Sequence, residues 1–336
     1  MIRPSLWPAL AAGLLLCLHT VGVAQGARME GLYEAEVELE GSRELGFREA
    51  LGEVFVRITG RPDAAGSPAL EPLLESASNY VQQFRQAGPN RLWVSFDGTA
   101  LERELGRLGQ PVWGAERPNT LFWVAVDGGG DRRFIVASEA ELSEEAEVRE
   151  RILAAARTRG IPVVLPLLDA EDRAQAPFAE IWGDFEDSIR RASVRYGVDA
   201  VMVGRLVAGD FPRGRWTLYE SDGVERWTGG IDQGVQRLAD LHAARFAVVS
   251  SGSSRALRLT VSGIGSVGDY GRVSRFLGGL TAVESLGVES VDDDRVVFRV
   301  ALRGEPATLD EAVRLGGLLQ PDRLPGERDL SYRVAR

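Results

Sequence analysis

Residues 120–126 read Thr-Leu-Phe-Trp-Val-Ala-Val, an almost unbroken apolar run that predicts a β-strand buried on both faces. Two later runs, 161–168 and 199–207, have the same character and predict two more buried strands. Helical patterns lie between and after these strands, from Ser143 as N-cap to Gly160, over 179–196 and over 233–249. Strands that alternate with helices predict a layered α/β domain over 118–252.

The residues before this domain predict a smaller α/β unit at 29–115. Residues 32–39 alternate apolar and polar side chains, as a half-buried strand does. Ser42 and Gly60 are suited to begin and end the helix that follows. We also expect a helix over 67–78, strands at 80–85 and 91–96, and a helix over 99–108.

The serine-rich stretch 250–254 predicts a linker, and a third unit follows it at 255–336. Its expected elements are strands at 257–261, 282–291, 295–302 and 330–334, with helices at 267–280 and 308–319. This β-α-β-β-α-β order is that of the ferredoxin-like split βαβ fold. The fold class expected for the chain is therefore α/β (α+β), with three small units in series.

The first 26 residues have the pattern of a cleavable secretory signal peptide. A charged start at Arg3 precedes an apolar core, and small residues surround a cleavage point between Gly26 and Ala27. An uncleaved anchor is less favoured because prolines and glycine interrupt the apolar run. A lipoprotein is also less favoured, because Leu16 precedes Cys17 where a lipidation site needs a small residue. We expect a periplasmic protein with no further membrane span.

Composition excludes several chemistries for the mature chain. Cleavage removes the single cysteine, Cys17, and leaves His242 as the one histidine, so thiol catalysis, disulfides and Cys/His metal sites are excluded. All 39 basic residues are arginine, which excludes lysine-based catalysis. The net charge of −10, with charges of both signs interspersed, argues against a nucleic-acid partner. We expect no cofactor and no metal.

The best candidate for a binding site lies after the predicted strand 161–168. Asp169 and Asp172 occupy the strand end, where open α/β sheets bind ligands. Carboxylate pairs can perform acid–base chemistry, although strand-end acids also serve as helix caps. Trp182, Arg195 and Tyr196 complete the set of candidate binding residues. No residue is assigned a catalytic role.

Three other features have ordinary structural explanations. Residues 263–268 fit G-x-G-x-x-G, but an exported split βαβ unit is a poor setting for a dinucleotide. Asp292–Asp294 is more typical of a solvated turn than of a calcium loop. The tryptophans at 113, 123, 182, 216 and 227 could supply a core or an aromatic surface that binds glycans.

Several segments together resemble the DUF2066 family of proteobacterial envelope proteins. They are Trp113-Gly114 with Arg117-Pro118, residues 159–169 with Asp172, Ile181–Gly183, Arg191–Tyr196, Val54–Gly60 and Val81–Arg85. The resemblance implies a bacterial periplasmic setting and assigns no activity, ligand or catalytic residue. The second unit is also similar, at the level of fold, to the TolB N-terminal domain and to LpoB-like and CsgG-like lipoproteins, whose small α/β domains mostly contact proteins.

The sequence leaves open whether the protein is an enzyme and favours a non-enzymatic role. The leading hypothesis is a periplasmic module for protein interaction or envelope assembly, with an envelope protein as partner. The alternative is an enzyme, or a binder of small molecules or glycans, that uses Asp169, Asp172 and Trp182. A concave site around these side chains would favour the alternative.

Overall fold

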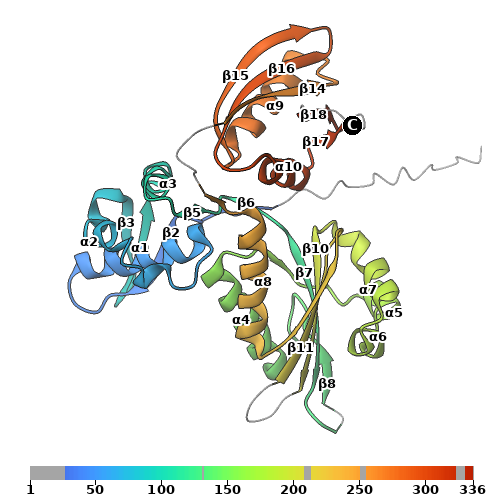
Figure 1. The fold of residues 1–336 in the computed structure, drawn as a ribbon. Helices are drawn as coiled ribbons and strands as arrows, with labels where there is room; N and C mark the ends of the chain where they lie inside the picture. Colours follow the sequence, from blue (N-terminus) through green and yellow to red (C-terminus); the bar gives the residue numbers. More distant parts are fainter. Residues whose placement is uncertain (1–26, 131, 208–212, 250–254, 323–329, 336) are drawn as a thin grey trace, which may run out of the picture.

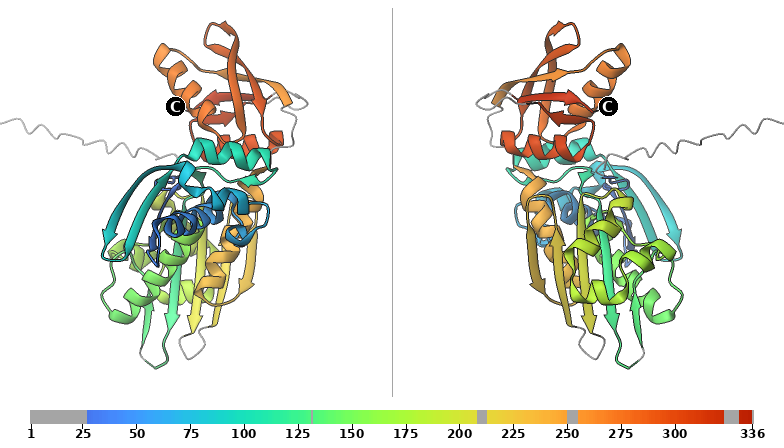
Figure 2. Two further views of the ribbon diagram at one scale, coloured as in Figure 1. Left: turned by 90° about the vertical axis from the view of Figure 1, so that its left-hand side faces the viewer. Right: turned by 90° about the vertical axis from the view of Figure 1, so that its right-hand side faces the viewer.

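The computed structural model describes residues 27–130, 132–207, 213–249, 255–322 and 330–335 (Figure 1). It shows a mixed α/β protein with several small sheets. Buried apolar side chains form four clusters, of which one belongs to the N-terminal unit, two to the central unit and one to the C-terminal unit. In both side views of Figure 2 the C-terminal unit sits above the other two, with helix α3 (Gly98–Arg107) at its base.

The N-terminal unit is a three-stranded antiparallel sheet covered by helices. Strand β4 (Arg91–Phe96) lies between β2 (Glu34–Glu38) and β3 (Val81–Gly88). Helix α1 (Arg43–Thr59) packs on this sheet. Its predicted ends are confirmed, since Ser42 Oγ accepts a hydrogen bond from Leu45 N and Gly60 adopts a left-handed φ of 69°.

The expected helix over 67–78 is mostly absent. Only Glu71–Glu75 (α2) is α-helical, and 3₁₀ turns at Ala64–Gly66 and Ala77–Tyr80 lie on either side of it. Helix α3 then leads to the short strand β5 (Pro111–Val112), which pairs with β13 (Val248–Val249) after the last central helix. Strand β1 (Ala27–Arg28) pairs with β6 (Glu116–Arg117).

The central unit is built around the strand 120–126, which the structure shows as β7 (Thr120–Asp127). The sheet has the order β12-β11-β10-β7-β8, and β9 also pairs with β7. Strands β7 and β10 are parallel, with Trp123 opposite Val203. The other strands of this sheet are β8 (Arg133–Ile135), β9 (Val163–Val164), β10 (Ala200–Val207), β11 (Arg213–Tyr219) and β12 (Val224–Thr228).

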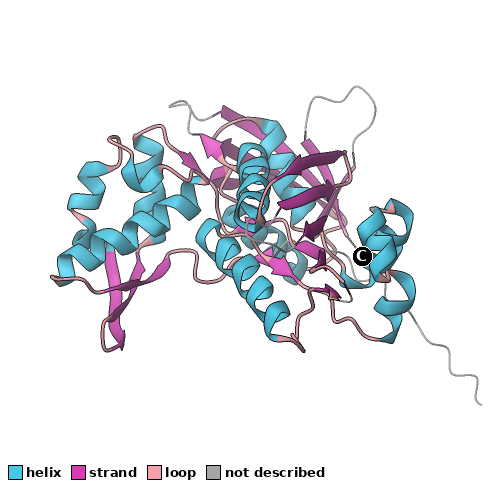
Figure 3. Cartoon of the chain, turned by 90° about the horizontal axis from the view of Figure 1, so that it is seen from below, coloured by secondary structure: helices cyan, strands magenta, loops and turns pink. Residues whose placement is uncertain are grey.

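Helices cover both faces of the central sheet, as the view from below shows (Figure 3). Phe122, Val124 and Val126 pack with α4 (Ser143–Arg159) and α8 (Ile231–Phe246). Leu121, Trp123 and Ala125 face the opposite group of helices. That group consists of α5 (Ala170–Gln175), α6 (Phe178–Gly183) and α7 (Glu186–Ser193). Both faces of β7 are therefore buried, which explains its continuous apolar sequence.

Three details of the central unit differ from the sequence-based expectation. The strand expected at 161–168 shrinks to β9, because Pro162 and Pro166 lack the N–H that a sheet needs. The single helix expected over 179–196 divides at Asp184, whose φ is 57°. Ser143 is the first helical residue of α4, and the N-cap is Leu142.

The helix is interrupted at Asp184 because the side chain of this residue bonds to residues of the sheet beneath it. One carboxylate oxygen accepts a hydrogen bond from Thr217 Oγ1 at 2.8 Å and the other accepts one from the Tyr219 hydroxyl at 2.9 Å. Arg205 adds an ion pair at 3.1 Å. These contacts fix the corner between α6 and α7 on the face of β11.

The C-terminal unit is a five-stranded sheet with the order β15-β16-β14-β18-β17. Its strands are β14 (Arg255–Ser262), β15 (Val283–Asp292), β16 (Arg295–Leu302), β17 (Leu319–Pro321) and β18 (Leu330–Val334). Helices α9 (Val267–Gly279) and α10 (Pro306–Leu315) pack against it. Strand β17 was not expected from the sequence. Because β17 precedes β18 and pairs antiparallel with it, β18 runs parallel to β14, unlike the antiparallel neighbour of a simple split βαβ unit.

A fully buried arginine joins the N-terminal and central units. The Arg117 guanidinium donates five hydrogen bonds of 2.7–3.2 Å to backbone carbonyls. The acceptors are Arg57, Trp113, Gly114, Arg159 and Gly160. Burial lowers the pKa of Arg117 to about 9, so it stays charged at neutral pH. Its charge lies at the C-terminal ends of α1 and α4, where the helix dipole favours a cation.

Two sequence-based predictions concern residues outside the described parts of the chain: the signal peptide at 1–26 and the linker at 250–254. Among the described residues, no helix is both long enough and apolar enough to span a bilayer.

Candidate functional site

The structure brings four of the five candidate binding residues together beside α5. Asp169 is the N-cap of that helix, and its Oδ1 accepts hydrogen bonds from the backbone N–H groups of Glu171 and Asp172. Arg195 and Tyr196 belong to the 3₁₀ turn Val194–Tyr196 that follows α7. We call Asp169, Asp172, Arg195 and Tyr196 the strand-end cluster.

Arg195 links the two acids of the strand-end cluster. Its guanidinium donates to both oxygens of Asp169 at 2.8 Å and to Asp172 Oδ1 at 3.2 Å. The hydrogen bonds from Arg195 lower the pKa of the Asp169 carboxyl to about 2, and the backbone N–H groups contribute in the same direction. Asp169 is therefore a carboxylate at every physiological pH and has no proton to donate as a general acid.

Asp172 is the buried centre of the cluster, with no exposed side-chain surface. Its Oδ2 accepts hydrogen bonds from Leu168 N at 2.9 Å and from the Tyr196 hydroxyl at 2.5 Å. The same hydroxyl accepts a hydrogen bond from Leu167 N at 2.9 Å. Burial raises the pKa of Tyr196 to about 12, and the bond to Asp172 adds to this shift. These contacts hold the backbone at Leu168, whose φ is 51°.

The fifth candidate, Trp182, belongs to a different group of side chains. Its ring stacks on Phe178, with centroids 5.5 Å apart and planes 15° from parallel. Among the described residues no hydrogen bond or ion pair joins Trp182 to the strand-end cluster, and the cluster's own polar groups are bonded to one another. The arrangement fastens the loop after β9 to the turn after α7 and offers little to a substrate.

The remaining sequence candidates are placed by turns and by packing. Gly263 has a φ of 82° and its N–H bonds to Asp294, so the glycines turn β14 into α9. His242 is buried on α8, where Nε2 lies 3.3 Å from a Glu220 carboxylate oxygen and neither ring nitrogen has a hydrogen bond to a described residue. Trp113, Trp123 and Trp216 are buried in the core, which leaves them unavailable as a glycan platform. Among the described residues, no group of three or more His, Cys, Asp or Glu side chains is placed to hold a metal ion.

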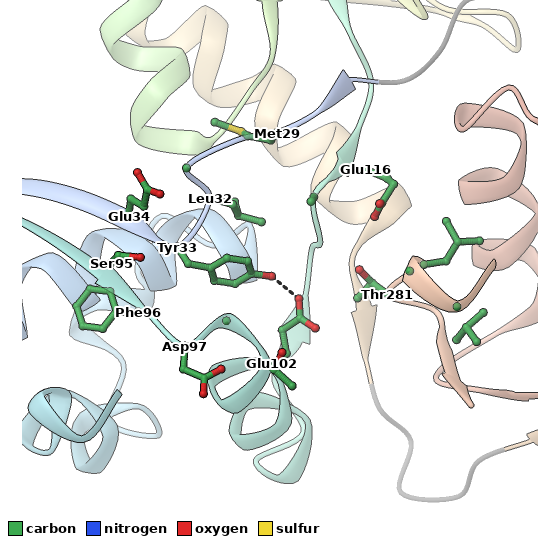
Figure 4. A pocket seen from close by; sticks show the side chains of 18 of the residues that line it. Met29, Leu32, Tyr33, Glu34, Ser95, Phe96, Asp97, Glu102, Glu116 and Thr281 are labelled. Atoms are coloured by element: carbon green, nitrogen blue, oxygen red, sulfur yellow. Dashed lines mark hydrogen bonds between the residues drawn. The ribbon is translucent and has the colours of Figure 1, made fainter. Parts of the chain in front are cut away.

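Sequence reasoning missed a cavity between the N-terminal and C-terminal units. This cleft has a volume of about 630 Å³ (Figure 4). Its walls come from β2, β4, α3 and β6 on one side and from residues 278–284 with Arg303 on the other. Five acidic residues and one arginine line it: Glu34, Asp97, Glu102, Glu116, Glu284 and Arg303. We call it the acidic cleft.

Some of the acids in the cleft are already used by the fold. Glu102 accepts a hydrogen bond from the Tyr33 hydroxyl, as Figure 4 shows. Burial raises the pKa of Tyr33, and the Glu102 carboxylate adds to this effect. Asp97 caps α3 by accepting from Ala100 N at 3.0 Å. The carboxylates of Glu34 and Glu284 make no hydrogen bond or ion pair with another described residue.

The acidic cleft continues into a second hollow of about 410 Å³ between α9 and β15. The two cavities share Gly278, Val283 and Glu284 in their walls. No pattern in the sequence indicates either cavity, because the walls come from segments up to 270 residues apart that carry no common motif. Only the packing of the units brings them together.

One family model matches part of the chain. It is a domain of unknown function (DUF8605), and it covers residues 26–114, which is the N-terminal unit with the few residues before it. A search of the curated proteins found no match to the chain.

The resemblance to DUF2066 is therefore wrong. Two of the segments that suggested it, 54–60 and 81–85, lie inside the part of the chain that matches DUF8605. Others have local roles that recur in unrelated folds: Gly160 ends α4 in a left-handed conformation and Arg117 binds carbonyls at helix ends. Short segments of this kind reflect helix ends and turns, which recur in unrelated proteins, more than they reflect descent from a common ancestor. The bacterial setting that the resemblance implied loses that support.

Proposed function

We propose that the protein is a non-enzymatic module for binding other proteins, and that it works outside the cytoplasm. The observation that carries this proposal is a pair of exposed edge strands. Strand β3 pairs with β4 and strand β15 pairs with β16, and neither has a second partner among the described strands. An edge strand offers unpaired N–H and C=O groups along its length, to which an extended segment of another protein can bind.

The edge strand β3 shows the features of a contact surface. Residues 82–86 of this strand are exposed, and Phe84 keeps 48% of its surface accessible. The Phe84 ring meets Phe47 edge-on at 5.3 Å, and the Arg43 guanidinium lies 5.1 Å from its centroid. Because these contacts already restrict the Phe84 ring, this side chain would lose little conformational freedom when a partner covers it.

The enzymatic alternative gains no support from the site. Asp169 and Asp172 are bonded by their own chain, and Trp182 stacks on Phe178. A binder of small molecules at this position would need polar groups that converge on a cavity. The cleft of about 630 Å³ lies elsewhere and is lined by other residues.

The extracellular or periplasmic location is supported by the pattern of residues 1–26, with a charged start, an apolar core and small residues at 24 and 26. Mass spectrometry of the mature protein from its source cell tests this. We expect a chain that begins at Ala27 and carries no lipid. A mature chain that retains Met1, or one lipidated at Cys17, would overturn this part of the proposal.

The finer fold assignments belong to the same proposal. The central unit, with a sheet covered on both faces, is compared with the small α/β domains of TolB and of LpoB-like lipoproteins. The C-terminal unit is treated as a ferredoxin-like fold with the added strand β17. Two helices packed against a sheet in which β14 is central support the second assignment. Such likeness is a weak guide to function.

Site-specific photocrosslinking tests the main proposal. A photoreactive phenylalanine replaces Gln83 on β3 or Ser290 on β15 in the full chain, and Arg237 on the exposed side of α8 is the control. The variants are irradiated with envelope extract of the source cell, and adducts are identified by mass spectrometry. We expect one protein to be captured from an edge strand and not from position 237. No adduct at either edge, with the fold intact by circular dichroism, would overturn the proposal.

A further inference from the structure

Strand β15 has the exposed edge that best fits an added strand. All its residues from Glu284 to Asp292 are exposed except Leu286, which is half-buried. In Figure 1 the strand forms the outer edge of the C-terminal unit. The register with β16 is regular over Ser285–Val288, and bulges occur at Glu284 and Glu289. Because bulges interrupt pairing, the free edge is about four residues, or roughly 13 Å, long.

A groove runs beside this edge. Tyr270, Ser274 and Gly278 form one stripe of α9 that faces the strand, and Phe298 contributes from β16. Leu286 and Val288 line the strand side of the groove, and 46% of the Val288 surface is accessible. The Ser274 hydroxyl oxygen is buried and has no hydrogen-bond partner among the described residues. The groove is suited to apolar side chains that project from an added strand.

The groove ends in the acidic cleft, which gives the combined groove and cleft a negative charge. Glu284 is exposed and lines both cavities, and Glu34 and Glu116 are half-buried in the walls of the cleft. The junction of groove and cleft is open at Gly278. This residue has no side chain, and a Cβ atom at its position would meet no atom within 4 Å. An extended segment along β15 would therefore place one end among five carboxylates opposed by Arg303. Carboxylates near a partially enclosed site favour a cation.

A second copy of this chain fits the site poorly. Two β15 strands side by side would bring Glu284 and Asp292 of one copy near the acids of the other, whereas Glu289 is already paired with Arg258 and Arg299. Like charges on neighbouring strands are unfavourable, and the whole chain carries a net charge of −10. The charge distribution requires a partner of the opposite sign.

We propose that β15 and the groove beside α9 bind an extended segment of a partner protein. The segment pairs with Ser285–Val288, places alternate apolar side chains in the groove, and positions an arginine or lysine in the acidic cleft. This inference rests on the proposed function, and it specifies where the partner binds and which chemistry it presents.

A displayed library of random linear 12-residue peptides, selected on the mature full-length chain, tests the proposal. We expect the enriched peptides to contain alternating apolar residues next to arginine or lysine. Their affinities are then measured on two variants of α9, Gly278→Trp and Gly271→Trp. A Cβ atom at either glycine would meet no atom within 4 Å, so we expect both variants to fold, which thermal unfolding verifies.

The two variants should behave differently. Gly278→Trp fills the junction of groove and cleft and should weaken binding by about tenfold or more, whereas Gly271→Trp should change it by less than about twofold. Glu284→Arg should weaken basic peptides by a similar factor, with Glu225→Arg on exposed strand β12 as its control. Raising the salt concentration should weaken binding further.

Three results would overturn the proposal: no enrichment of peptides, enrichment of peptides without basic residues, or equal binding to the two glycine variants. Photocrosslinking to a protein partner that persists unchanged in Gly278→Trp would also overturn it. That last result would leave the proposed protein-binding function intact, with the contact on another surface such as β3. If the photoreactive variants that retain Gly278 formed no crosslink to any protein, the proposed function itself would be overturned.

Discussion

The strand-end cluster and the acidic cleft are both rich in carboxylates, but their carboxylates are used in different ways. In the cluster, Arg195 bonds both acids, Tyr196 bonds Asp172, and Asp172 has no exposed side-chain surface. In the cleft, Glu34 and Glu284 border about 630 Å³ of open space, and their carboxylates make no hydrogen bond or ion pair with a described residue. Acids that are saturated by their own chain stabilise the fold, whereas acids that face a cavity are available to a ligand.

Removing the centre of the cluster should have the largest effect. Asp172→Ala leaves the Leu168 N–H, the Tyr196 hydroxyl and part of the Arg195 guanidinium without their acceptor. We expect the free energy of unfolding to fall by about 3 kcal/mol. Urea denaturation of the chain measures it. A loss below about 1 kcal/mol would mean that the cluster is not a structural fastening.

Tyr196→Phe should have a smaller effect, because it removes one hydroxyl and keeps the ring against Trp123. The hydroxyl donates to Asp172 and accepts from Leu167 N, so we expect a loss of about 1–2 kcal/mol. A double-mutant cycle with Asp172→Asn should show coupling between the two sites. Additive effects would contradict the hydrogen bond as the source of the loss.

Acid should weaken the cluster over a defined range of pH. Arg195 lowers the pKa of Asp169 from 3.8 to about 2, so the folded state binds this proton less tightly than the unfolded state. The pair therefore stabilises the fold above about pH 4, and this contribution is lost as the pH falls toward 2. In Arg195→Gln, carbon NMR titration should show a higher pKa for Asp169. Arg190→Gln is the control, since Arg190 pairs with Glu186.

The smallest effect on stability is expected in the cleft. Glu284→Gln removes a carboxylate charge that has no hydrogen-bond or ion-pair partner among the described residues, and we expect the free energy of unfolding to change by less than about 0.5 kcal/mol. The same urea experiment measures it. A loss comparable to that of Tyr196→Phe would place Glu284 with the structural acids and remove the contrast between the two regions.

Local patterns in the sequence predict most elements but not the exceptions. The apolar run 120–126 and the caps at Ser42 and Gly60 act through neighbouring residues, so the strand and the helix ends are predictable. The break at Asp184 is not, because it depends on Thr217 and Tyr219, more than 30 residues away. Strand β17 has only three residues, too few for a periodic pattern.

The candidate site shows the same limit. Proximity in the sequence placed Asp169 beside Asp172 and Arg195 beside Tyr196, and the structure brings the two pairs together. Their mutual saturation could not be predicted, since it depends on how the turn after α7 meets the loop after β9. The acidic cleft depends on the N-terminal and C-terminal units together and is visible only when they are assembled.

The buried Arg117 has a mechanical consequence for the cleft. A planar side chain with five bonds resists both sliding and rotation, and here it ties the ends of α1 and α4 to one another. The N-terminal and central units should therefore move as one rigid body. If the cleft widens to admit a peptide, the C-terminal unit would then move relative to the N-terminal and central units, which would keep their positions relative to each other.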